Sequence, residues 1–168
     1  ITTAFAGRLS NTYQVLMAPI GPEASQYIQN AQLKQLTDEE AEDLDGIVTK
    51  AEIVGAIRTL KTAKTPGADG LPAEYYHKHA EPLAEKLVEV FKEAKEIGRL
   101  PDSMREALVV MIPKQGKDQG MVSSYSPISM LNIDTKILSR VLANRLLQHL
   151  PRLVHPDQNG LIPGRNTL

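Results

Sequence analysis

The segment EALVVMIPK, residues 106–114, decides the fold class that this sequence predicts. A short apolar run that is rich in β-branched residues and stops at a proline is typical of a strand. A second run of this kind, YSPISML at residues 125–131, follows a polar stretch that contains Gly116 and Gly120. We therefore predict a β-hairpin over about residues 106–131, with the polar stretch as its tip.

Helical patterns surround this hairpin on both sides. TKAE at residues 49–52 is a capping box, in which a hydroxyl and a carboxylate each satisfy a free backbone N–H. Apolar residues then recur at helical spacing, and prolines and glycines mark the expected ends. We predict helices over residues 1–16, 37–44, 49–63, 73–80, 82–97 and 132–150, with Asn132 or Asp134 as the cap of the last helix. The fold class is therefore α+β and mostly helical, with one hairpin packed among helices.

Composition excludes several classes of protein. The 168 residues are 42% hydrophobic and 23% charged, which is typical of a globular chain, and they include no cysteine. A disulfide scaffold, a thiol nucleophile and a thiolate metal site are thereby ruled out. The aspartates of the second part are widely spaced, the adjacent acids at 38–40 are explained by a helix start, and His77 and His79 would not face each other on a helix, so we predict no metal site. No signal peptide or membrane-spanning run is present, so we expect an intracellular protein without a membrane partner, and the missing initial Met suggests a fragment.

Charge is unevenly distributed along the chain. Residues 1–98 contain 10 Lys and Arg against 15 Asp and Glu, whereas residues 99–168 contain 9 against 5. The second part could therefore face phosphates, although an ordinary solvated surface explains the same charges. The candidate cations are Lys114, Lys117, Lys136, Arg140, Arg145 and Arg165.

Four sequence blocks resemble those of one enzyme family, in the same order and at similar spacing. They are KTPGADGLP at 64–72, IPKQGKD at 112–118, YSPISMLN at 125–132 and HPDQNGLIPGR at 155–165. Each is similar to a block of the reverse transcriptases of LINE-type non-LTR retrotransposons. The resemblance covers about residues 36–168, which implies a partial reverse transcriptase domain, and residues 1–35 look like the helical linker that precedes it.

In that family these blocks build the fingers of a right-hand polymerase. The resemblance implies that the palm, with its catalytic aspartates, is absent from this chain, so that the segment alone is not catalytic. It implies no cofactor here, although the full-length family enzyme uses Mg²⁺. The implied partners are an RNA template, a DNA primer, and the missing palm and thumb of the same polyprotein.

Site residues follow from the same resemblance. Lys114 matches a lysine expected to meet the triphosphate of the incoming nucleotide, and Ser126 stands where the family has an arginine for the same purpose. Ala68, Gln115 and Leu161 are further departures from the family pattern. The cations expected to contact nucleic acid are Lys117, Lys136, Arg140, Arg145 and Arg165.

Two other functions stay open from the sequence. The chain could be a non-catalytic module that binds RNA or DNA, or the product of a decayed element with no selected function. A hairpin without a palm would also expose apolar surface, so we expect marginal stability or self-association.

Overall fold

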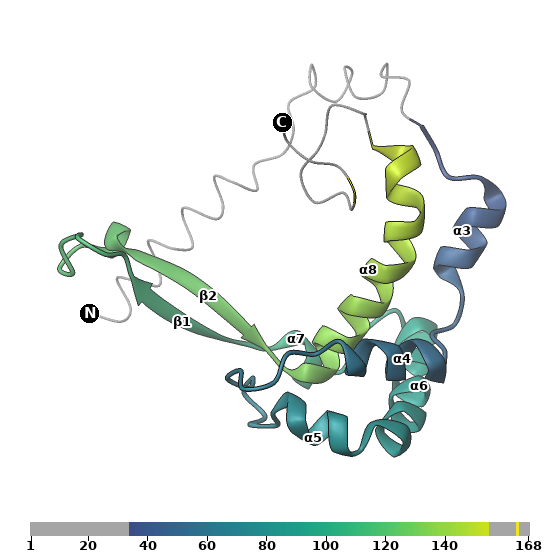
Figure 1. Cartoon of the computed structure of the whole chain (residues 1–168), viewed down its shortest axis with the longest axis horizontal. Helices are drawn as coiled ribbons and strands as arrows, with labels where there is room; N and C mark the ends of the chain where they lie inside the picture. The colour runs from purple at the N-terminus through teal and green to yellow at the C-terminus, as the bar shows by residue number, and fades with distance from the viewer. Residues whose placement is uncertain (1–33, 155–163, 165–168) are drawn as a thin grey trace. The chain divides into compact units, whose positions relative to one another are not determined.

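The computed structural model describes residues 34–154 and Gly164 of the chain (Figure 1). Its elements are α3 (Asp38–Asp45), α4 (Lys50–Arg58), α5 (Ala73–Lys78), α6 (Ala80–Ile97), α7 (Asp102–Arg105), β1 (Ala107–Pro113), the 3-10 turn η1 (Val122–Ser124), β2 (Tyr125–Leu131) and α8 (Ile133–Leu153). The prediction of a mostly helical α+β fold with a single hairpin over 106–131 is confirmed for these residues. The helix predicted at 1–16 lies outside them.

The chain divides into two compact units. Of the described residues, the first unit holds Lys34 and Pro113–Ser126, and the second holds 35–112, 127–154 and Gly164. The core of the second unit lies where α4 packs against both α6 and α8. Its largest fully buried side chains come from α4 and α8, namely Ile53, Ile57, Ile137 and Val141.

The capping box predicted at the start of α4 is present. Thr49 Oγ1 accepts from the backbone N–H of Glu52 at 3.3 Å, and Glu52 Oε2 accepts from that of Thr49 at 2.8 Å. The helix ends at Arg58, earlier than the predicted Ala63. Its last turn tightens, because Leu60 N donates to Ile57 O three residues back, and Ala63 takes a left-handed φ of 54°.

Two prolines have different effects on the helices. Pro82 is the third residue of α6, where the backbone N–H has no partner within the helix, so the proline costs no hydrogen bond. The prediction that Pro151 ends the last helix is wrong, since α8 continues to Leu153. A proline so close to the end removes one backbone bond, and Val154 N still donates to Leu150 O at 2.9 Å.

The hairpin is apolar and largely exposed. β1 pairs with β2 in a two-stranded antiparallel sheet (Figure 1). Successive strand residues point to opposite faces, and Leu108, Val109 and Val110 are 48%, 52% and 39% exposed. Both faces of β1 therefore present apolar side chains to solvent. Every helix of the described residues is too short or too polar to cross a bilayer.

Candidate nucleotide and nucleic-acid contacts

The first and third sequence blocks meet within the second unit. Gly67 lies directly against Asn132, because a Cβ on Gly67 would fall 2.6 Å from the backbone N and 2.7 Å from the Cα of Asn132. The Asn132 side chain accepts from the backbone N–H of Asp69 at 3.3 Å and donates to Ser103 O at 2.9 Å. One buried amide thus ties the loop at 64–70 and helix α7 to the residue that follows β2.

Asn132 therefore does not act as the expected cap. It occupies the N-cap position of α8, but its side chain makes no capping hydrogen bond, since both of its polar atoms bind the neighbouring segments. Asp134 is the residue whose carboxylate accepts from a nearby N–H, that of Thr135 at 2.6 Å. Neither Asn132 nor Asp134 therefore makes the usual side-chain hydrogen bond from the N-cap position of α8.

A half-buried acid and a buried phenol lie beside this junction. Burial raises the pKa of Asp134, and the nearby Asp69 carboxylate raises it further. Burial also raises the pKa of Tyr76, with additional contributions from Asp134 and Asp69. Two carboxylates do not make a two-metal centre, and in the described ranges no three His, Asp or Glu side chains come together as a metal site. We derive no metal-dependent step from this chain.

The tip of the hairpin carries the residues expected to meet a nucleotide. Lys114 N donates to Ser124 O at 2.7 Å, and the Lys114 ammonium donates to Ser123 O at 3.0 Å. Gly116, with a φ of 70°, makes the turn that brings Lys117 N to 3.4 Å from Lys114 O. The first unit contains Lys114, Lys117 and Ser126. In the described chain, the ammonium groups of Lys114 and Lys117 have no acidic partner.

Asp118 does not neutralise these lysines. Its carboxylate accepts from the backbone N–H of Gly120 at 2.9 Å and so stabilises the turn. Two ammonium groups on a short exposed turn can act as point charges for a polyphosphate.

Helix α8 carries Lys136, Arg140 and Arg145, which lie in different surroundings. Lys136 and Arg140 line a solvent-open groove that also includes Lys61, in the segment after α4. Lys61 was not among the residues predicted from the sequence. Its only signal is its place three residues before Lys64, where the first block begins. Arg165 lies outside the described residues.

Arg145 lies inside the protein. Its side chain is 10% exposed and faces Glu52, with Nε to Oε1 at 2.6 Å and Nη2 to Oε2 at 2.9 Å. Its other N–H groups donate to the carbonyls of Leu44, Gly46 and Ile47 at 3.2, 2.6 and 3.0 Å. All five guanidinium donors are engaged, so we leave Arg145 out of the proposed nucleic-acid contacts.

The arginine has a clear effect on its partner. The hydrogen bond from Arg145 lowers the pKa of Glu52 to about 2, against the opposing effect of burial. The same bond raises the pKa of Arg145. This pair therefore stays fully charged at neutral pH and joins α8 to the start of α4.

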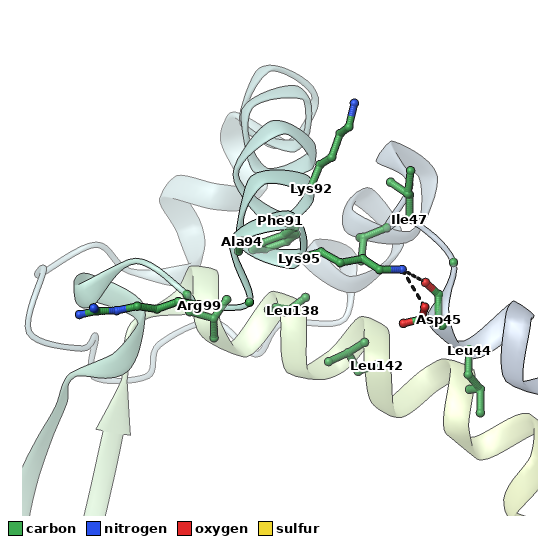
Figure 2. A pocket seen from close by; sticks show the side chains of 14 residues that line it. Leu44, Asp45, Ile47, Phe91, Lys92, Ala94, Lys95, Arg99, Leu138 and Leu142 are labelled. Atoms are coloured by element: carbon green, nitrogen blue, oxygen red, sulfur yellow. Dashed lines mark hydrogen bonds and ion pairs between the residues drawn. The ribbon is translucent and has the colours of Figure 1, made fainter.

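A separate pocket in the second unit is apolar (Figure 2). It has a volume of about 340 Å³ and lies between the 44–48 linker, the end of α6 and α8. Phe91, Leu138 and Leu142 line it, and Lys95 at its edge is paired with the Asp45 carboxylate at 3.1 Å (Figure 2). Among the residues that the structure describes, none of those predicted to contact nucleotide or nucleic acid lines this pocket.

Comparisons with known proteins place the chain among mobile-element proteins. It is 32% identical over 164 residues to the 149 kDa protein of transposon TX1 of Xenopus laevis, covering 96% of this chain and 12% of that protein. It is 33% identical over 100 residues to the RNA-directed DNA polymerase from the mobile element jockey of Drosophila melanogaster, covering 60% and 11%. It is 31% identical over 119 residues to the probable RNA-directed DNA polymerase from transposon BS of the same fly, covering 70% and 13%.

No family model matches the chain. The relatives are nevertheless all proteins of transposons or mobile elements, and together they match most of the length of the chain. The chain spans about an eighth of the TX1 protein and a similar share of the others. Its homologues are thus non-LTR retrotransposon proteins and RNA-directed DNA polymerases, and the chain belongs to the reverse transcriptase family of LINE-type elements.

Proposed function

We propose that this chain is the fingers region of a non-LTR retrotransposon reverse transcriptase, which contacts the incoming nucleotide and the template and does not catalyse alone. The observation that carries the proposal is the junction at Asn132. Two blocks that resemble those of the polymerases converge on this buried amide, directly after the strand that returns from the Lys114 tip. The homology to RNA-directed DNA polymerases supports the same function.

The tip would serve as the contact for the triphosphate. Lys114 supplies a compact positive charge, and its bond to Ser123 O orients the ammonium without neutralising it. Ser126 offers a neutral hydroxyl where an arginine would make charge-assisted bonds of about twice the strength. We therefore expect weak binding of triphosphate by this chain. The magnesium chemistry of synthesis would depend on residues of the full polymerase outside this segment.

Binding of a labelled deoxynucleoside triphosphate to the purified chain tests the proposal. Lys114→Ala should weaken binding, and Ser126→Arg should strengthen it roughly tenfold, since a charged hydrogen bond contributes about 1.5–3 kcal/mol. Lys86→Ala, on the exposed face of α6, is the matched control and should change nothing. Equal affinity of the three variants would refute the assignment of the tip.

Primer extension tests the second part of the proposal. The purified chain, with a primed RNA template, deoxynucleoside triphosphates and Mg²⁺, should incorporate no nucleotide. Incorporation above the background of a heat-denatured sample would show that the chain is catalytic by itself.

A further inference from the structure

The groove that contains Lys61, Lys136 and Arg140 has the features of a site for phosphates. It lies within the second unit, between the segment after α4 and one face of α8, and has a volume of about 370 Å³. Lys61 comes from the segment after α4, while Lys136, Ser139 and Arg140 come from α8. Two segments that are far apart in the sequence therefore bring three cations to one hollow.

The charge of this groove is not neutralised by the protein. Within the described part of the chain, none of its three cations has an ion pair, whereas Lys50, Lys95 and Arg152 of the same unit each have one. No Asp or Glu is among the described lining residues. Unpaired cations that line one groove repel one another, and an anion bound among them would offset this repulsion.

The carbonyls at the end of α4 do not oppose an anion strongly. Thr59 Oγ1 donates to Ala56 O at 2.8 Å, and His77 Nε2 lies 3.0 Å from Leu60 O. Ala56 belongs to the last turn of α4 and Leu60 follows its end, so each of these carbonyls already has a partner. The negative end of a helix is equivalent to about half an elementary charge, which three cations exceed. The positive charge of the side chains therefore dominates the groove.

The spacing on α8 suits a repeating anion. Lys136 and Arg140 are one turn apart on the same face, which places their Cβ atoms about 5–6 Å from each other. The two cations thus form a short row along the helix, and Lys61 lines the same groove. A row of this kind can follow neighbouring phosphates of one strand.

The lining also indicates what the groove does not recognise. Its described residues include no aromatic ring on which a base could stack and no Asn or Gln that could read a base edge. Ser139 Oγ already donates to Thr135 O at 2.8 Å. Contacts would therefore go to the backbone of the strand and not to its sequence.

We propose that the groove of Lys61, Lys136 and Arg140 binds the phosphodiester backbone of a single nucleic-acid strand without regard to sequence. This inference rests on the proposed function, because a polymerase must hold its template, and it adds the location and the manner of the contact. It assigns Lys61 a role that the sequence did not suggest.

A salt titration tests this inference. Fluorescence anisotropy would give the affinity of the full chain for two labelled single-stranded RNAs of unrelated sequence, over a series of KCl concentrations. The variant Lys61→Gln/Lys136→Gln/Arg140→Gln should lower the slope of log affinity against log salt by about 2, at roughly 0.7 for each lost phosphate contact. The decrease should be equal for the two RNAs.

The control variant is Lys86→Gln/Lys92→Gln/Arg99→Gln. It removes the same charge from α6 and from Arg99, two residues after its end, and it should keep the wild-type slope. If the wild type binds and both variants share its slope, the groove is overturned and the proposed function stands. If the wild type shows no salt-dependent binding, nucleic-acid contact by this chain is refuted, and the groove with it.

Discussion

Replacing Arg145 should destabilise the second unit more than replacing any other of its described cations. Arg145→Met keeps the length of the side chain but removes five N–H donors. Three carbonyls then lose the bonds from Arg145, and the Glu52 carboxylate keeps only its bonds from Thr49. Removing one member of a buried ion pair typically costs about 3–5 kcal/mol.

The pKa of Glu52 gives a second estimate. It falls from 4.5 to about 2, which corresponds to roughly 3 kcal/mol in favour of the charged form; Arg145 is the largest cause, and the hydrogen bonds from Thr49 also contribute. Because 30% of the Glu52 side chain remains exposed, solvent screens part of this energy. Because Glu52 is partly exposed and keeps its bond from Thr49, we expect Arg145→Met to lower the free energy of unfolding at neutral pH by about 2–3 kcal/mol, at or below the lower end of the range for a fully buried pair.

The same pair predicts a pH dependence. The folded pKa of Glu52 lies below its unfolded value, so its stabilisation is present above about pH 4.5 and is lost as pH falls toward 2. The difference between wild type and Arg145→Met should therefore shrink over this window.

Urea denaturation followed by far-UV circular dichroism measures both effects. Arg140→Met is the matched control, since it changes the same residue type on an exposed face of the same helix, and it should stay within about 0.5 kcal/mol of wild type. If the variant is unfolded at neutral pH, Arg145→Lys, which keeps the charge, should restore part of the transition. Equal stability of Arg145→Met and Arg140→Met, or a difference that does not change down to pH about 2, would refute the reasoning.

Three further predictions follow from the fold. Gly67→Ala should cost at least about 1–3 kcal/mol, because its Cβ would fall on the backbone of Asn132, and the midpoint of urea unfolding measures this against Gly55→Ala, where the added carbon meets nothing. Asn132→Ala should cost about 1–3 kcal/mol by leaving Asp69 N and Ser103 O unpaired; an unchanged melting temperature would show that water replaces the amide. Val110→Lys should reduce self-association in sedimentation experiments without lowering the melting temperature, since Val110 is exposed on the hairpin; a monomeric wild type would contradict this.

Local signals in the sequence were sufficient for most of the elements. The capping box at Thr49, the glycine at the end of α6 and the strand at 125–131 all depend on residues close together in the chain. The sequence missed α7, because Asp102–Arg105 is a single turn whose one buried side chain, Met104, packs only through tertiary contacts.

The site was less predictable for the same reason. Lys136 and Arg145 lie on one helix and have similar sequence surroundings, yet one lines a groove and the other is enclosed by residues about a hundred positions earlier. The 3.6-residue period of a helix predicts which face of the helix a residue occupies. It does not predict which other segments pack against that face. Lys61 could not be linked to Arg140 without the packing of α4 on α8.

The reach of Arg145 also bears on how the protein is made. Its guanidinium binds Leu44 O across 101 residues and Glu52 across 93. A ribosome adds about 5–20 residues per second, so the linker before α4 emerges several seconds before the side chain that holds it. During that interval α4 and the linker before it lack the hydrogen bonds from Arg145, and these bonds can form only after α8 has been translated.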